Sequence, residues 1–130
     1  MEIHGVHHLA VRTPDLLAAE RFYVHVLGLP VMERLAHPDG SPRSIWITLP
    51  GGAFLALEAT PEGRQRADDE PGWHCVALSI ARADREAWRE RLAEAGHPVE
   101  RESDFTLYAR DPGGALVALS HYPDPASAAP

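Results

Sequence analysis

The sequence predicts an α+β fold made of two successive modules, each with the element order strand, helix and three strands (βαβββ). Apolar residues alternate in several short segments and recur at helical spacing in two longer ones, which distinguishes strands from helices. Each helical run ends at a glycine that is followed two residues later by a proline, in 28–30 (GLP) and 96–98 (GHP). Pro30 and Pro98 are 68 residues apart. A repeat at a nearly constant offset is typical of a duplicated structural unit.

Composition limits the class of protein. The 130 residues suffice for a hydrophobic core, and the single cysteine, Cys75, excludes an internal disulfide. A net charge of −7 argues against binding to nucleic-acid phosphates, which requires clustered Lys and Arg. No apolar stretch has the length of a membrane span, and the first residues lack the pattern of a signal peptide. We therefore expect a cytoplasmic protein with no membrane or nucleic-acid partner.

The first module is expected over residues 3–59. Its predicted elements are a strand at 3–12, a helix at 16–27 and strands at 29–35, 44–49 and 53–59. Thr13 is expected to cap the helix, Pro14 stands where a missing N–H costs nothing, and Asp15 suits the positive end of the helix dipole. The turn 50–52 (PGG) makes the last two strands a hairpin.

The second module is expected over residues 73–122. Its predicted elements are a strand at 73–80, a helix at 84–95 and strands at 99–102, 105–110 and 115–122. Segment 60–72, rich in proline, glycine and charge, is predicted to be a linker between the modules. Residues 124–130, rich in alanine and proline, are predicted to be a flexible tail. The chain is thus expected to be one domain over 1–123 with a short tail.

Three motifs in this order resemble the vicinal oxygen chelate superfamily, which includes glyoxalase I, extradiol dioxygenases, fosfomycin-resistance enzymes and bleomycin resistance proteins. They are the opening 8–15 (HLAVRTPD), the pair 22–23 (FY) before 26–29 (VLGL), and the turn 111–114 (DPGG). The resemblance implies mixed sheets curled into paired cups, the glyoxalase/bleomycin resistance/dioxygenase fold, and a homodimer. It also implies a divalent metal held by the first and fourth strands of each module, with positions left open for two neighbouring substrate oxygens.

In this chain the four positions that the resemblance implies for metal ligands are occupied by His8, Ala56, Cys75 and Ala118. Because alanine has no donor atom, we expect a protein that binds a small molecule in the cup without the family metal and without a cofactor, as bleomycin resistance proteins do. The alternative is a metal-dependent lyase, isomerase or dioxygenase in which His8, Glu58 and Cys75 form a displaced ligand set for Zn, Ni, Mn or Fe. His8 and Glu58 are then the candidate catalytic residues, and the register of the fourth strand decides between Ala56 and Glu58.

The residues expected to bind the ligand are those that the family resemblance places on the side of their strands that faces the cup. They are His8, Arg12, Trp46, Phe54, Trp73, Cys75 and Tyr108. Aromatic rings offer stacking surfaces to planar or cationic ligands, and Arg12 has the parity to hold an anionic group or to pair with Glu58. The same residues are also compatible with a filled core, in which Cys75 is a small buried hydrophobe. By parity, His74 is expected to face the helix side of its sheet, and His121 to lie on the helix side or at an edge.

Overall fold

The computed structural model describes residues 1–127 and divides the chain into two compact units, Met1–Gln65 and Arg66–Pro130. The boundary falls inside segment 60–72, which the sequence predicts to be a linker. Within the described residues, no helix has the length and apolar character needed to span a membrane.

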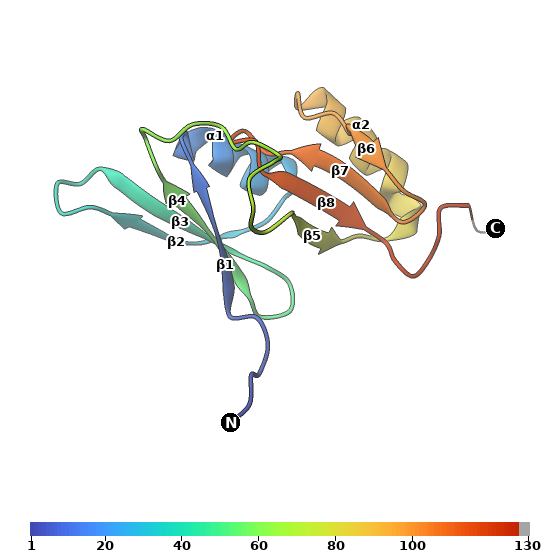
Figure 1. The fold of residues 1–130 in the computed structure, drawn as a ribbon, viewed down its shortest axis with the longest axis horizontal. Coiled ribbons are helices and arrows are strands. Elements are labelled where there is room, and N and C mark those ends of the chain that lie inside the picture. Colours follow the sequence, from blue (N-terminus) through green and yellow to red (C-terminus); the bar gives the residue numbers. More distant parts are fainter. Residues whose placement is uncertain (128–130) are drawn as a thin grey trace. The chain divides into compact units, whose positions relative to one another are not determined.

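The first unit has the βαβββ order that the sequence predicts (Figure 1). Its elements are β1 (His8–Thr13), α1 (Leu16–Glu20), the π-helical η1 (Arg21–Val26), β2 (Val31–Ala36), β3 (Pro42–Thr48) and β4 (Phe54–Ala59). The strands form one sheet in the order β1-β4-β3-β2, in which only the pair β1 and β4 is parallel. The α+β fold class is therefore confirmed for this half of the chain.

The helix of the first unit begins and continues differently from the prediction. Asp15, and not Thr13, is the N-cap, because its carboxylate accepts a hydrogen bond of 3.0 Å from the backbone N–H of Ala18. The predicted helix 16–27 is α-helical only to Glu20 and then continues as a π-helix, in which the N–H of Leu27 donates to the carbonyl of Phe22 at 2.9 Å. It ends as predicted at Gly28, whose φ of +77° favours glycine.

The register of the first sheet sorts its side chains onto two faces. Ile45 is opposite Leu57 and Ile47 is opposite Leu55, and all four are buried. Helix α1 packs on β3 and β4, and this aliphatic face therefore forms the core with the equally buried Phe22. The other face, which we call the first open face, carries the alternate residues of three strands. These are His8, Ala10 and Arg12 of β1, Ser44, Trp46 and Thr48 of β3, and Phe54, Ala56 and Glu58 of β4.

The second unit repeats this topology (Figure 1). Its elements are β5 (Val76–Ser79), the single 3₁₀ turn η2 (Arg82–Asp84), α2 (Arg85–Glu94), β6 (Arg101–Glu102), β7 (Thr106–Arg110) and β8 (Leu116–Ser120). The strand order is β5-β8-β7-β6, and again only the first pair is parallel. Its second open face carries Ala77, Ser79, Arg101, Thr106, Tyr108, Arg110, Leu116, Ala118 and Ser120.

Strand β5 is shorter than the predicted strand 73–80. It begins at Val76, whose partner on β8 is Val117. β8 itself starts only at Leu116, shortly after the turn at 111–114, so residues 73–74 extend beyond the start of their partner strand. Strand alternation therefore does not govern where Trp73 and His74 point.

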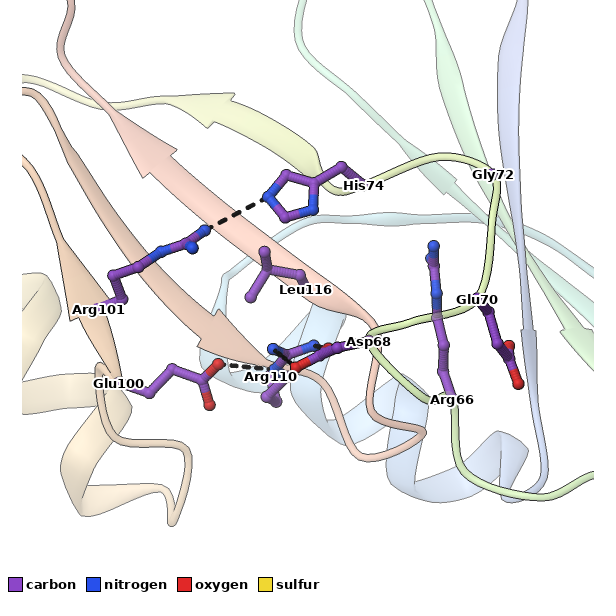
Figure 2. A pocket seen from close by; sticks show the side chains of 9 residues that line it. All are labelled: Arg66, Asp68, Glu70, Gly72, His74, Glu100, Arg101, Arg110 and Leu116. Carbon is purple, nitrogen blue, oxygen red and sulfur yellow. Dashed lines mark hydrogen bonds and ion pairs between the residues drawn. The ribbon is translucent and has the colours of Figure 1, made fainter.

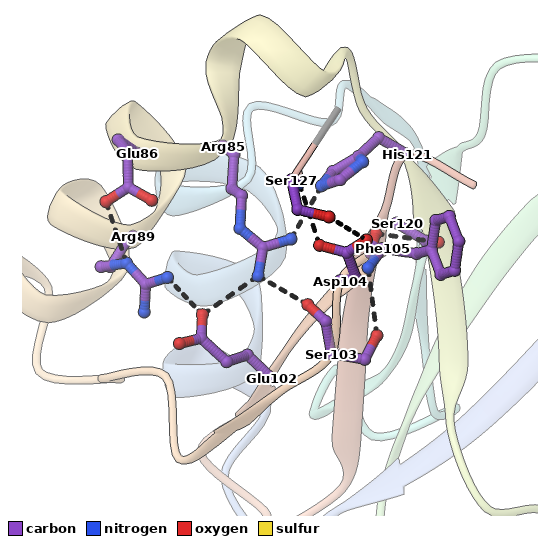
Figure 3. A network of polar contacts seen from close by, with 10 residues as sticks. All are labelled: Arg85, Glu86, Arg89, Glu102, Ser103, Asp104, Phe105, Ser120, His121 and Ser127. Carbon is purple, nitrogen blue, oxygen red and sulfur yellow. Dashed lines mark hydrogen bonds and ion pairs between the residues drawn. The ribbon is translucent and has the colours of Figure 1, made fainter. Parts of the chain in front are cut away.

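A buried polar network joins helix α2 to the sheet of the second unit (Figure 3). Arg85 Nη1 lies 2.7 Å from His121 Nε2, while its Nη2 donates to Glu102 at 3.0 Å and to the carbonyl of Ser103 at 2.8 Å. Only 8% of Arg85 and 4% of His121 are exposed. His121 thus lies on the helix side, one of the two positions that the sequence predicts for it.

The chain after β8 is hydrogen-bonded over its described part. The N–H of Ala126 donates to the carbonyl of Asp104 at 2.7 Å, and the hydroxyl of Ser127 donates to the Asp104 carboxylate at 2.8 Å. Residues 128–130 of the predicted tail 124–130 lie outside the described residues.

Candidate functional site

Three rings form a continuous stacked row across the first open face. The ring centroids of His8 and Phe54 are 4.8 Å apart with an interplanar angle of 12°, and those of Phe54 and Trp46 are 4.7 Å apart at 29°. The strand pairing explains this arrangement. His8 lies opposite Phe54 on the adjacent β4, and Trp46 of β3 lies opposite Ala56, two residues along β4 from Phe54. The row presents an unsaturated surface that suits a planar or cationic ligand.

His7 adds a fourth ring to this row, which parity did not predict. It precedes β1, and its ring makes edge contacts with His8 at 5.2 Å and with Phe54 at 5.6 Å. The Nδ1 atoms of His7 and His8 are 2.9 Å apart, so one imidazole donates to the other. This hydrogen bond fixes the His8 ring over Phe54 and engages one of its two nitrogens.

The other end of the first open face is polar. Arg12 lies directly opposite Glu58, and Ser44 is the next partner across the ladder. The hydroxyl of Ser44 is buried, and among the described residues it has no hydrogen-bond partner. A ligand that covers the aromatic row therefore has a guanidinium and a carboxylate further along the same face.

The register also places the residues of the alternative metal set. Ala56 is opposite Ala10, whereas Glu58 is opposite Arg12. His8 is opposite Phe54, so His8 and Glu58 are separated by four residue steps, about 13 Å along the strands. That spacing exceeds what two side chains of adjacent strands span when both bind one ion at about 2 Å.

The donor atoms at the four family positions do not fit a divalent metal. Ala56 and Ala118 lie on the open faces of their sheets, on β4 and β8, and are 2% and 1% exposed. Their methyl groups offer no lone pair, which leaves one imidazole at His8 and one thiol at Cys75. Divalent metals in oxygen chemistry take three or more N and O donors, and this set supplies too few.

The second open face carries Tyr108 directly opposite Ala118. The guanidinium carbon of Arg101, on the neighbouring β6, stands 4.5 Å from the centre of the Tyr108 ring, a cation–π contact. Tyr108 thus lies on the same face as the family position at Ala118, as the resemblance implies.

A pocket of about 410 Å³ lies at one end of this face (Figure 2). The pocket is formed within the second unit by Arg66, Asp68, Glu70, Gly72, His74, Glu100, Arg101, Arg110 and Leu116. Arg110 is bound by two carboxylates, Glu100 at 2.8 Å and Asp68 at 2.9 Å, and it also donates to the carbonyl of Gly114. Partial burial lowers the pKa of Arg110, but the two carboxylates outweigh that effect and raise it.

His74, which precedes β5, lies elsewhere than predicted. His74, expected on the helix side, lines the pocket, and its Nε2 is 3.3 Å from Nη2 of Arg101. Trp73, expected in the cup by strand parity, is 89% exposed and precedes the strand. Cys75 is half-buried at the same irregular segment. The placement of His74 follows from the late start of β5, and the expected roles of Trp73 and Cys75 stay predictions.

The structure brings four of the predicted ligand-binding residues, His8, Arg12, Trp46 and Phe54, onto one face of the first unit. Tyr108 lies on the second open face. The pocket residues His74, Arg101 and Arg66 were not predicted, because no motif marks them and their positions follow from the linker and from an edge strand of two residues. Ligand binding by His8, Arg12, Trp46, Phe54 and Tyr108 stays a prediction.

Two successive βαβββ units, each with one four-stranded mixed sheet and an open face, define the fold class of the vicinal oxygen chelate proteins. The family model of the glyoxalase/bleomycin resistance protein/dioxygenase superfamily matches residues 5–119, and the chain belongs to this superfamily.

Individual relatives agree with that assignment. An ethylmalonyl-CoA/methylmalonyl-CoA epimerase from Cereibacter sphaeroides is 31% identical over 132 residues, covering 90% of this chain and 97% of the epimerase. A glyoxalase family protein from Enterococcus faecalis has a TM-score of 0.76 at 23% identity, over 93% of this chain and all of the other. A fosfomycin resistance protein from Listeria monocytogenes has a TM-score of 0.74 at 16% identity, over 92% of this chain and 93% of the other. The two structural likenesses concern the fold.

Proposed function

We propose that this chain is a ligand-binding member of the superfamily, which binds a small molecule with a planar unsaturated part on the first open face and does so without a metal. The stacked row of His8, Phe54 and Trp46 carries the proposal. A planar ligand that covers these rings buries apolar area on both sides and gains stacking contacts of about 0.5 to 1.5 kcal/mol per ring pair.

The polar end of the face adds a preference for an acid. Arg12 lies two residue steps, about 7 Å along the strands, from the level of Trp46 on the same face, which is within the length of a two-ring molecule. A guanidinium binds a carboxylate through two parallel hydrogen bonds. Planar aromatic acids are therefore the first compounds to test, with benzoate, 2-naphthoate and indole-3-acetate as a series of increasing ring area.

The experiment measures binding of these acids by isothermal titration calorimetry, for the parent protein and for Phe54→Ala. Removing the central ring is expected to weaken 2-naphthoate binding about tenfold, since stacking and apolar burial are both lost. The matched control is Trp88→Ala, which removes an aromatic ring from helix α2 in the second unit and is expected to leave the affinity unchanged.

Metal independence has its own measurement. The affinity is expected to be the same after treatment with EDTA and in the presence of added Zn, Ni, Mn or Fe, because Ala56 and Ala118 supply no donor atoms. Binding that disappears with EDTA and returns with one of these metals contradicts this part of the proposal. Equal affinities of the parent protein and Phe54→Ala for all three acids contradict the ligand site itself.

A second candidate function, epimerisation of an acyl thioester next to a carboxylate, is favoured by the similarity to the Cereibacter epimerase. Epimerisation requires a base that removes the α-proton and an acid that returns it on the other side. His8 and Glu58 are each a candidate for the base on the first open face, but at about 13 Å apart along the strands they cannot both reach one α-carbon. The test is exchange of the α-proton of methylmalonyl-CoA in D₂O, followed by proton NMR with and without added divalent metal. Exchange that is lost in His8→Ala favours the enzyme, and no exchange under any condition favours the binding protein.

A further inference from the structure

Three arginines and three carboxylates line the pocket of the second unit, and the carboxylates are Asp68, Glu70 and Glu100. Arg110 is matched by the carboxylates of Asp68 and Glu100, which hold it between them (Figure 2). Arg101 and Arg66 line the same pocket, and within residues 1–127 neither lies within ion-pair distance of a carboxylate. The chain has 19 acidic against 12 basic residues, so unmatched arginines are not the result of an excess of positive charge.

The guanidinium of Arg101 is held in place by neighbours that do not neutralise it. Its carbon lies 4.5 Å from the centre of the Tyr108 ring, and its Nη2 is 3.3 Å from Nε2 of His74. The ring face orients the planar guanidinium, and the imidazole engages one of its five N–H groups. The other N–H groups of the Arg101 guanidinium stay available to a ligand, and the Tyr108 ring already holds the guanidinium in place.

Arg66 approaches the same pocket from the segment between the units. Its guanidinium donates to the backbone carbonyl of Trp73, and its own N–H donates to the carbonyl of Gly113 at 3.0 Å. The partner of the guanidinium is a neutral carbonyl and not a carboxylate, so this second cation is not neutralised by that contact. Figure 2 shows His74 on the segment that joins the linker to β5, above Leu116.

We propose that this pocket binds a small oxyanion, a carboxylate or a phosphoryl group, with Arg101 as its principal contact and Arg66 and His74 beside it. Guanidinium groups bind both kinds of oxyanion through paired, charge-assisted hydrogen bonds. The pocket of about 410 Å³ has room for such a group together with a short attached chain. The site is made by the second unit alone and does not depend on the aromatic row of the first unit.

The test is a ¹H–¹⁵N correlation NMR titration of the full chain with sodium malonate and, separately, with sodium phosphate, at constant pH and with ionic strength held constant by sodium chloride. Saturable shifts are expected at the amides of Arg101, His74 and Leu116. Arg101→Ala is expected to weaken the apparent Kd about tenfold or more, the usual effect of losing hydrogen bonds to a charged group. The malonate and phosphate arms distinguish a carboxylate from a phosphoryl ligand.

The matched control is Arg91→Ala. Arg91 is also an exposed arginine above an aromatic ring, 5.8 Å from Trp88, and its loss changes the net charge by the same amount. It is expected to leave both titrations unchanged. Arg101→Lys keeps the charge and loses the planar fork, so an intermediate affinity is expected.

Three outcomes overturn the proposal. They are shifts that do not saturate with either anion, saturable shifts that sodium chloride reproduces, and an unchanged Kd in both Arg101→Ala and Arg101→Lys. The aromatic acids are also titrated in these spectra and read at the amides of His8, Trp46 and Phe54, so failure of the proposed function and failure of the oxyanion site are separate results. Trp46→Leu is expected to leave malonate and phosphate binding unaffected.

Discussion

Arg85 is predicted to be the principal polar anchor of the second unit, and Arg85→Ala tests this. The substitution removes the donor to His121, which is 4% exposed, and the donor to the Ser103 carbonyl, and so leaves two acceptors without their partner (Figure 3). Hydrogen bonds to a charged group contribute about 1.5 to 3 kcal/mol each when buried. The pair with Glu102 adds little, since that side chain is 48% exposed.

We therefore expect a loss of about 3 kcal/mol in the free energy of unfolding and a fall in Tm of about 10 °C for a chain of this length. Urea unfolding followed by far-ultraviolet circular dichroism measures the first quantity, and a thermal scan measures the second. The matched control on the same helix is Arg91→Ala, an exposed arginine for which we expect less than about 1 kcal/mol. Both substitutions replace an arginine of α2 by alanine and change the net charge by the same amount.

Arg85→Lys refines the measurement. A lysine ammonium is a point charge and cannot reach His121, Glu102 and Ser103 together, so about half of the loss is expected to remain. An Arg85→Ala variant that unfolds within about 0.5 kcal/mol of Arg91→Ala refutes the reasoning. In that case the network is only a surface cluster and does not hold α2 to the sheet.

Two further stability predictions concern single carboxylates. The hydrogen bond from Arg34 lowers the pKa of Glu20 despite its burial, so the carboxylate stabilises the fold above its unfolded pKa of about 4.3 and this contribution is lost as the pH falls through the folded pKa. Glu20→Gln is expected to cost about 1 to 2 kcal/mol at pH 7 in urea unfolding and less at pH 3, and an equal cost at both pH values contradicts the assignment. Asp111 Oδ1 accepts from the N–H groups of Gly113 and Ala115 at 2.9 and 2.8 Å, so Asp111→Ala is expected to cost about 2 kcal/mol in thermal unfolding. Asp111→Asn keeps this acceptor, and a loss as large as that of alanine would show that charge and not the turn geometry is responsible.

The fold was predictable because its signals are local. Alternation, the two glycine stops and the repeated spacing of Pro30 and Pro98 determine the βαβββ order without reference to distant contacts. The π-helix after Glu20 was not predictable in this way. Apolar spacing does not distinguish an N–H of Leu27 that donates to Phe22 from one that donates to Tyr23, and packing decides between them.

The first open face was predictable for the same reason. Within a ladder, residues of one parity share a face, and His8, Phe54 and Trp46 accordingly stack on one another. The rule fails where the ladder ends. Trp73 and His74 precede β5, and the helix-side placement that parity gives His74 is wrong.

The oxyanion pocket depends on information of a third kind, the pairing of charges between segments. Parity places Arg101 and Arg110 on one face of the second sheet, but it does not distinguish them. The linker carries Asp68 to Arg110, and β6 starts one residue after Glu100, so both carboxylates reach the same arginine. Arg101 is not paired with either carboxylate, because Glu100 and Asp68 both bind Arg110. The candidate ligand contact is therefore identified by which carboxylates are already paired with another arginine in the fold. Because the chain has more acidic than basic residues, this pairing cannot be read from its composition and becomes visible only when the strands and the linker are in place.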